Sequence, residues 1–190
     1  MRSPRRHRKN PQMEVVQLPI DGALLIVPRV FSDERGYFKE IYAASRYRAQ
    51  GIDATFVQDN LSFSQRFVLR GLHTDPRMAK VVQVLTGAAY DVIVDARHES
   101  PSFMRWHAVT LRAQEHTQLY IPAGCLHGFL ALEDETALLY KQSSEYEPAA
   151  EFGIAWNDPD LAIEWPLEGA TPILSAKDAI NPTLRERGLL

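Results

Sequence analysis

Residues 68–80, VLRGLHTDPRMAK, bring together side chains that can move a proton. His73 lies between Arg70 and Lys80, close to Gly71 and just ahead of the apolar run VVQVLTG. Imidazole titrates near neutral pH, so a histidine at the wall of a cavity can act as a base, and neighbouring cations can stabilise the anion that forms. A histidine packed in the interior would only form hydrogen bonds. The stretch alone leaves both interpretations of His73 open.

A second histidine stands in residues 120–129, YIPAGCLHGF, which contain the pattern Pro-x-Gly-x-x-His. This pattern is similar to the second half of the cupin signature, in which the glycine permits a sharp turn and the histidine, here His127, points into a barrel. Metal-binding cupins add a His-x-His pair and a glutamate from a first motif. The corresponding segment here offers His73 and then Lys80, whose ammonium group would repel a divalent cation. We therefore expect no metal ion at the site.

Proton transfer is the chemistry that best suits a cavity holding His, Tyr, Asp, Lys and Arg side chains. The sequence has no G-x-G-x-x-G or P-loop motif, and we expect no cofactor. A histidine held by a carboxylate can remove a proton from a carbon beside a carbonyl group, while a cation stabilises the enolate oxygen. A tyrosine on the opposite side can return a proton, and this return to the other face inverts the carbon centre.

The elements that must position these side chains are short apolar segments separated by turn residues, as in strands. They are ALLIVPRVF, FVLRG, VVQVLTG, AAYDVIVDA, FMRWHAVTL, TQLYIPAG, HGFLALE and TALLYKQS. Residues 43–51, AASRYRAQG, predict a helix ending at Gly51. This pattern predicts an all-β fold: a cupin-type jelly roll, or double-stranded β-helix, with few short helices. The irregular residues 151–178 should wrap the barrel and contribute to its mouth.

Alternation along residues 88–96, AAYDVIVDA, indicates which side chains face a cavity. Tyr90 and Val92 project to one side, whereas Asp91 projects to the other. We interpret Asp91 as a carboxylate on a polar inner face. For Asp95, near the strand end, we favour an ordinary half-exposed position.

Length and composition favour one domain, because 190 residues with 45% apolar content can fill a single core. We assign residues 13–190 to this domain and residues 1–12 to a basic, disordered extension, which carries five of the 21 Lys and Arg residues. The remaining chain is acidic, which argues against a nucleic-acid partner. One cysteine, Cys125, and the lack of a membrane-length apolar run favour a cytoplasmic protein with no membrane partner.

An ordered set of motifs resembles one known family. The motifs are FSDERGYFKE, FVQDNLSFS, VLRGLH, DVIVDARHESPSF, YIPAGCLHGF, LLYK, WNDPDLAIEWP and LSAKD, spread over residues 15–182. Together they are similar to the motif set of the dTDP-4-dehydrorhamnose 3,5-epimerase family, cupin-fold enzymes that act on sugar nucleotides. The resemblance implies a metal-independent epimerase that inverts C3, C5 or both in a nucleotide-linked 4-keto-6-deoxyhexose.

The resemblance also implies roles for individual residues. His73 matches the base that abstracts the proton, and Asp178 resembles the carboxylate that orients it. Tyr140, in LLYK, matches the opposing acid, and Lys80 the lysine that neutralises charge on the C4 oxygen.

Further positions carry over from the family as contacts to the substrate. Those that line the sugar or diphosphate correspond to Gln58, Asn60, Arg70, His127, Glu151 and Lys177, and Asp91 resembles another cavity-facing carboxylate. Arg35 and Glu40 resemble residues delivered to the nucleotide end of a partner's site when a homodimer exchanges an N-terminal strand.

The loop after His73 departs from the family pattern. Family members follow this histidine with an aromatic residue and glutamine and then a longer loop, whereas here Thr74 and Asp75 follow and the loop is short. Asp75 and Arg77 should therefore lie where a ligand enters. This change leaves open a single-centre 3- or 5-epimerase or a ketoisomerase on another nucleotide sugar. A non-catalytic cupin that binds sugar nucleotides is a further alternative.

Overall fold

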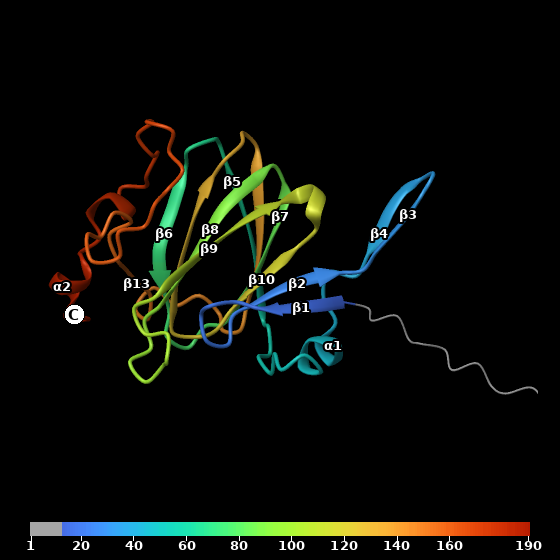
Figure 1. Cartoon of the computed structure of the whole chain (residues 1–190), viewed down its shortest axis with the longest axis horizontal. Coiled ribbons are helices and arrows are strands. Elements are labelled where there is room, and N and C mark those ends of the chain that lie inside the picture. Colours follow the sequence, from blue (N-terminus) through green and yellow to red (C-terminus); the bar gives the residue numbers. More distant parts are fainter. Residues whose placement is uncertain (1–12) are drawn as a thin grey trace, which may run out of the picture.

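A computed structural model describes residues 13–190, which form two antiparallel β-sheets packed face to face (Figure 1). The sequence-based assignment of residues 1–12 to an extension lies outside the described residues. One sheet has six strands, in the order β1 (Met13–Gln17), β2 (Leu24–Pro28), β10 (Gln118–Ile121), β7 (Lys80–Thr86), β12 (Thr136–Gln142) and β5 (Gln58–Ser64). The other has five, in the order β13 (Phe152–Gly153), β6 (Leu69–Thr74), β11 (Cys125–Ala131), β8 (Ala88–Asp95) and β9 (Trp106–Arg112).

The strand order is that of a jelly roll, because the chain passes back and forth between the sheets. β6 lies in the five-stranded sheet, β7 in the six-stranded sheet and β8 again in the five-stranded one. Partners distant in sequence therefore pair, such as β12 with β5 and β11 with β6. The expected all-β, cupin-type fold is confirmed.

The main core fills the space between the two sheets. It consists of inward-facing side chains of both sheets and of the turn between β1 and β2: Ile20, Ala23, Val82, Val84, Ala89, Ile93, Leu111, Leu119, Ile121, Cys125, Phe129, Ala131 and Leu138. Full burial of a large apolar side chain such as Phe129 contributes about 1.5–3 kcal/mol. This apolar filling holds the sheets apart at a fixed spacing and leaves one end of the sandwich to polar side chains.

The C-terminal segment covers the outer face of the five-stranded sheet (Figure 1). Val92 and Val94 of β8 pack there against Ile154 and Leu184. The indole Nε1 of Trp165 donates to the carbonyl of Trp156 at 2.8 Å, so the tryptophans pin this irregular segment as a unit. Both faces of β8 are therefore buried. The segment ends in two short helices, the 3₁₀ helix η2 (Asp178–Ile180) and α2 (Leu184–Arg187).

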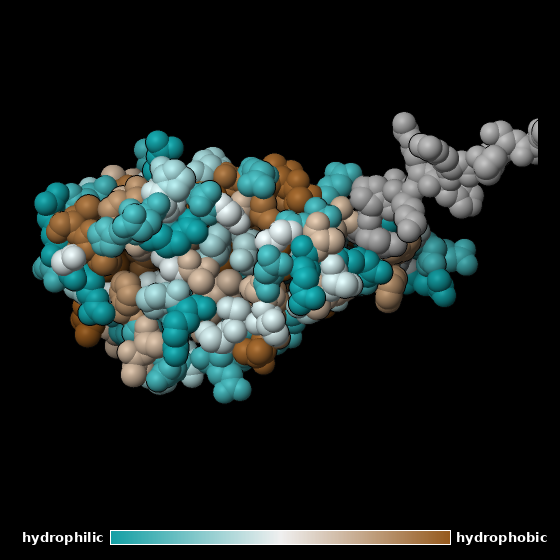
Figure 2. Space-filling model, turned by 90° about the horizontal axis from the view of Figure 1, so that it is seen from below, coloured by the Kyte–Doolittle hydropathy of each residue, from teal (hydrophilic) through white to brown (hydrophobic). Residues whose placement is uncertain are grey.

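A two-stranded hairpin extends away from both sheets (Figure 1). It consists of β3 (Val30–Asp33) and β4 (Gly36–Lys39), followed by α1 (Ala44–Arg48), and the 3₁₀ helix η1 (Ala113–Glu115) lies near its base. At that base Lys39 Nζ donates to His116 Nδ1 at 3.1 Å. Seen from below in Figure 2, the body narrows toward the hairpin, and hydrophobic side chains form scattered patches on this face.

Three local expectations need correction. The run ALLIVPRVF forms two strands, because Pro28 ends β2 and β3 leaves in the projecting hairpin. β5 was not predicted as a strand, since five of its seven residues are polar. Asp95 is fully buried rather than half-exposed. Its carboxylate accepts from Arg97 Nε at 2.8 Å and from the Ser102 hydroxyl at 2.5 Å, so it closes the turn after β8.

Candidate active site

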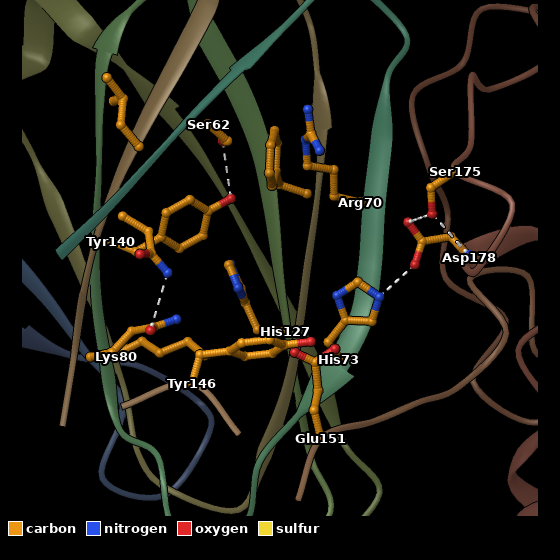
Figure 3. A pocket seen from close by; sticks show the side chains of 14 residues that line it. Ser62, Arg70, His73, Lys80, His127, Tyr140, Tyr146, Glu151, Ser175 and Asp178 are labelled. Atoms are coloured by element: carbon orange, nitrogen blue, oxygen red, sulfur yellow. Dashed lines mark hydrogen bonds and ion pairs between the residues drawn. The ribbon is translucent and has the colours of Figure 1, made fainter. Parts of the chain in front are cut away.

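One end of the sandwich opens into a cavity of about 420 Å³ between the two sheets (Figure 3). Its walls come from the inner faces of β5, β6, β7, β11 and β12 and from two segments that follow them. The lining residues are Asn60, Leu61, Ser62, Arg70, His73, Lys80, His127, Phe129, Tyr140, Gln142, Tyr146, Glu151, Ser175 and Asp178. Most of these side chains are polar or charged, so this end of the sandwich is built to bind a polar molecule.

Two glycines bring β6 and β11 close together and so set the position of His73. Gly71 has φ 126°, and a Cβ atom on it would lie 2.5 Å from the Cα of Gly128. Only a residue without a side chain fits such an approach. The pairing places His73 directly across from His127 on the neighbouring strand. Gly71 of the RGLH motif is therefore explained by the close pairing of β6 with β11.

His73 and Asp178 form a hydrogen-bonded pair at the cavity wall. Nε2 of His73 contacts Oδ1 of Asp178, a residue at the start of η2 that is 4% exposed. The Ser175 hydroxyl donates to the other carboxylate oxygen at 2.9 Å and accepts from the Asp178 backbone N–H at 3.0 Å. Burial opposes ionisation of Asp178, but the bond and charge of His73 and the Ser175 bond together lower its pKa below the ordinary value. Asp178 is thus an anion that fixes the His73 ring.

Tyr140 approaches the same cavity from the opposite sheet. It lies on β12 of the six-stranded sheet, whereas His73 lies on β6 of the five-stranded sheet. The phenol oxygen is 3.2 Å from the hydroxyl of Ser62. Burial raises the pKa of Tyr140 well above its ordinary value, with Asp91 adding to the shift and Ser62 and Arg70 opposing it. The phenol therefore stays protonated at neutral pH and is suited to donate a proton.

Lys80 begins β7 and supplies a poorly solvated cation to the cavity. Burial lowers its pKa below the ordinary value, although the charges of Glu151, Asp91 and Asp75 oppose this shift. An ammonium group that has lost water gains more from an anion that forms next to it than an exposed one does. Lys80 is therefore suited to stabilise a developing oxyanion.

His127 forms a second histidine–carboxylate pair behind the cavity surface. Its Nε2 lies 2.9 Å from Oδ1 of Asp91, and the two residues are 5% and 0% exposed. The His127 and Tyr140 rings form a T-shaped pair, with centroids 6.1 Å apart and an interplanar angle of 74°. His127 is thus held in one orientation between Asp91 and Tyr140.

Comparisons with known proteins identify the family. The family model described as dTDP-4-dehydrorhamnose 3,5-epimerase matches residues 17–186, most of the chain. The chain belongs to the dTDP-4-dehydrorhamnose 3,5-epimerase family. It is 45% identical to the enzyme of that name from Pseudomonas aeruginosa over 169 residues, which cover 87% of this chain and 93% of the relative.

Solved structures agree with this family membership. An epimerase from Legionella pneumophila in complex with dTDP-4-keto-L-rhamnose has a TM-score of 0.88 and 43% identity, and the match covers 94% of this chain and 97% of that one. A 3'-monoepimerase from Streptomyces bikiniensis in complex with dTDP-quinovose has a TM-score of 0.84 and 38% identity, with coverages of 91% and 90%. The chain is accordingly an isomerase of the sugar-nucleotide epimerase family, an enzyme of deoxysugar biosynthesis.

Eight of the candidate residues from the family motifs line the cavity. These are Asn60, Arg70, His73, Lys80, His127, Tyr140, Glu151 and Asp178. Three more candidates do not line the cavity but contact a residue that does. Gln58 donates to Asn60 Oδ1 at 2.9 Å, Lys177 pairs with Glu151, and Asp91 pairs with His127.

Arg35 and Glu40 do not reach the cavity of their own chain. Arg35 is at the tip of the hairpin, where its side chain is 84% exposed and pairs with Asp33 at 2.5 Å. Glu40 pairs with Arg46 of α1. A role for these two residues in the epimerase site therefore requires a second chain.

Six lining residues were not among the sequence candidates: Leu61, Ser62, Phe129, Gln142, Tyr146 and Ser175. Ser62 could have been found, since it follows Asn60 by two positions on the same strand face. Ser175 precedes Asp178 by three positions in LSAKD. Tyr146 follows β12 in an irregular stretch, where no periodicity indicates its direction.

Residues 13–190 contain neither a metal-binding cluster nor a membrane-spanning helix. No group of three or more His, Cys, Asp or Glu side chains in this range is arranged to hold a metal ion. No helix in this described part is long and apolar enough to cross a membrane.

Proposed function

We propose that the cavity is the active site of an epimerase that inverts C3 and C5 of a dTDP-linked 4-keto-6-deoxyhexose. One observation carries the proposal: the His73–Asp178 pair faces Tyr140 across a single cavity that also contains Lys80. A base and an acid on opposite sheets can reach opposite faces of one sugar ring. This is the arrangement that inversion through an enolate requires.

His73 is the base in this mechanism. Because Nε2 is bonded to Asp178, the ring nitrogen left for the substrate is Nδ1, on the cavity side of the ring in Figure 3. Nδ1 takes the proton from the carbon next to the C4 ketone, and the electron pair of the broken C–H bond moves into an enolate. Asp178 stabilises the imidazolium that results.

Lys80 and Tyr140 complete the reaction. The Lys80 ammonium stabilises negative charge on the C4 oxygen while the enolate exists. Tyr140 then donates its phenol proton to the opposite face of the same carbon, and the ketone re-forms with inverted configuration. Water returns a proton to the phenolate and accepts one from His73, which restores the starting state.

The substrate assignment rests on the relatives and on the charge of the cavity. The Legionella pneumophila protein binds dTDP-4-keto-L-rhamnose. In this chain Arg70 and Asn60 line the cavity, and a cation and an amide suit a diphosphate and a sugar. A single-centre 3-epimerase is the second candidate, favoured by the Streptomyces bikiniensis neighbour and by the short loop after His73.

A homodimer is part of the proposal, as is a cytoplasmic location. The hairpin exposes Phe31, Tyr37 and Phe38 by 43%, 60% and 72%, which is unfavourable for an isolated arm. Exchange of this arm with a partner would bury these rings and carry Arg35 toward the partner's cavity. A Phe38→Ser variant should shift the protein from dimer to monomer in sedimentation velocity. A wild-type chain that sediments as a monomer at all concentrations would contradict the exchange.

The function is tested by proton NMR of the wild-type enzyme with dTDP-4-keto-6-deoxyglucose in deuterated buffer. We expect solvent deuterium at both C3 and C5. Deuterium at C3 alone would favour the single-centre epimerase. No exchange with this substrate or with its CDP- and GDP-linked counterparts would overturn the assignment.

A further inference from the structure

Residues 143–151, here called the mouth segment, connect β12 to β13 and border the cavity. They contribute Tyr146 and Glu151 to its lining. In Figure 3 these two side chains lie together below His127 and His73. The Tyr146 side chain is large and half exposed, at 49%, so its position depends on what holds its backbone.

Polar contacts attach the mouth segment to three neighbouring elements. At its start, Ser143 N–H donates to the carbonyl of Ala79 at 3.0 Å, and the Ser143 hydroxyl accepts from Ala79 N–H at 2.8 Å. The Tyr146 N–H donates to Oε1 of Gln58 at 2.9 Å. At the far end Lys177 pairs with Glu151. Between these ends, the contact at Glu147 comes from Arg77.

Arg77 is held in place by the buried carboxylate of Asp75. Asp75 is 3% exposed and accepts from Arg77 Nε at 3.0 Å, from Nη2 at 2.7 Å and from the Arg77 backbone N–H at 3.0 Å. Such a bidentate pair fixes the plane of the guanidinium group. The remaining Nη1 donates to Glu147 at 2.8 Å. A buried anion thus aims one free nitrogen of Arg77 at the mouth segment.

We propose that Arg77 is a positioning residue that joins the loop after β6 to the mouth segment and so holds Tyr146 and Glu151 at the entrance for the substrate. The proposal rests on the assignment of the cavity as the active site. Both partners inside the loop, Asp75 and Arg77, belong to the short stretch that departs from the family pattern. In this chain an ion pair between loops therefore compensates for the shorter loop.

Arg77 acts through the mouth segment and not by contact with the substrate. All three of its side-chain nitrogens already have carboxylate partners, on Asp75 and Glu147. It is absent from the cavity lining. A loss of Arg77 should therefore weaken substrate binding and leave the proton-transfer step, which involves other residues, unchanged.

The test compares Arg77→Met, Glu147→Gln and the double variant in the full chain. The exposed Arg77–Glu147 pair contributes little, so we expect Glu147→Gln to raise KM about two- to fivefold with kcat within about twofold. Arg77→Met also leaves the buried Asp75 carboxylate without its guanidinium partner, so it should raise KM at least as much. The double variant should be no worse than Arg77→Met, because Glu147→Gln removes no contact that Arg77→Met leaves in place. Arg77→Lys should restore part of the loss. Arg185→Met is the matched control, since Arg185 binds Asp160 through two nitrogens at 2.8 and 2.7 Å outside the cavity.

Hydrogen exchange provides a readout that does not depend on activity. The amides of residues 143–147 should exchange at least about twofold faster in Arg77→Met and Glu147→Gln, while those of β12 remain unchanged. This measurement tests the ion pair even if the wild-type enzyme proves inactive on every sugar nucleotide, which would refute the proposed function alone. Three results would overturn the inference: unchanged exchange in the mouth segment, a fall in kcat at constant KM, or a KM effect of Arg77→Met that Glu147→Gln does not share.

Discussion

Replacing Asp178 with asparagine gives a sharp test of the His73–Asp178 pair. The Ser175 hydroxyl accepts from the Asp178 backbone N–H at 3.0 Å and donates to the side-chain oxygen at 2.9 Å. An asparagine that keeps this bond must turn its amide oxygen toward Ser175 and its NH₂ group toward Nε2 of His73. Nε2 would then accept a hydrogen bond, and the ring proton would move to Nδ1, the nitrogen that the substrate needs free.

The expected loss follows from two contributions. Removing a charge-assisted hydrogen bond costs about 1.5–3 kcal/mol, or roughly 10- to 150-fold in rate. A wrong histidine tautomer in the Ser-His-Asp triad lowers kcat about 10⁴-fold. We therefore expect Asp178→Asn to lower kcat by about 10² to 10⁴, with little change in KM because Asp178 lies behind His73. Deuterium incorporation at C3, followed by NMR, measures this rate directly.

A second substitution separates the tautomer effect from a general loss of charge. Without the Ser175 hydroxyl, the amide introduced by Asp178→Asn can rotate and offer its oxygen to Nε2. The double variant Ser175→Ala, Asp178→Asn should therefore be at least about tenfold faster than Asp178→Asn alone. The single variant Ser175→Ala is the control and should lose less than about tenfold. Retention of kcat within about fivefold in Asp178→Asn would refute this account of the pair.

Three other predictions concern the acid, the strand pairing and the buried turn. Tyr140→Phe should slow inversion about 10²- to 10⁴-fold while deuterium exchange on the His73 side continues, and exchange lost to the same extent as inversion would contradict its role as the acid. Gly71→Ala forces a Cβ to 2.5 Å from Gly128 at φ 126°, so the free energy of unfolding in urea should fall by more than about 2 kcal/mol. An unchanged midpoint of urea unfolding would contradict this prediction, because β6 and β11 would then move apart without loss of stability. Burial opposes ionisation of Asp95, but the hydrogen bonds from Arg97 and two serines outweigh this effect and lower the pKa of the carboxyl group. The ionised Asp95 therefore stabilises the fold above about pH 4, and this stabilisation is lost as the pH falls further. Asp95→Asn should be less stable than the wild type near pH 7 but should lose less stability between about pH 4 and pH 2.5. If the free energy of unfolding falls with pH as steeply in the variant as in the wild type over this range, the role assigned to Asp95 is wrong.

The fold could be predicted from sequence to the extent that strands alternate visibly. β8 and β11 are short apolar runs bounded by turn residues, and the inward direction of Asp91 followed from the two-residue period. β5 could not be found in this way, because an edge strand with one face toward a polar cavity loses its apolar alternation. The break at Pro28 depended on where the hairpin leaves the sheet, which is a property of the whole fold.

The candidate site likewise contains residues that the local sequence predicts and residues that it does not. His73 and Lys80 lie seven residues apart, so their neighbourhood was evident from one stretch of chain. Asp178 is 105 residues from His73, and no local pattern brings the two together. The resemblance to the epimerase family supplied that pairing. The hairpin residues Arg35 and Glu40 pair with Asp33 and Arg46 of their own chain, away from its cavity, so a role for them in the site depends on a second chain.

The central claim is that His73 removes the proton beside the ketone. Its most direct test is the solvent deuterium content at C3 and C5 of dTDP-4-keto-6-deoxyglucose after incubation with His73→Asn in deuterated buffer, with binding checked separately by calorimetry. We predict that the variant binds the sugar nucleotide within about tenfold of the wild-type affinity and incorporates no deuterium above the enzyme-free control. Deuterium incorporation at the wild-type rate would contradict the claim.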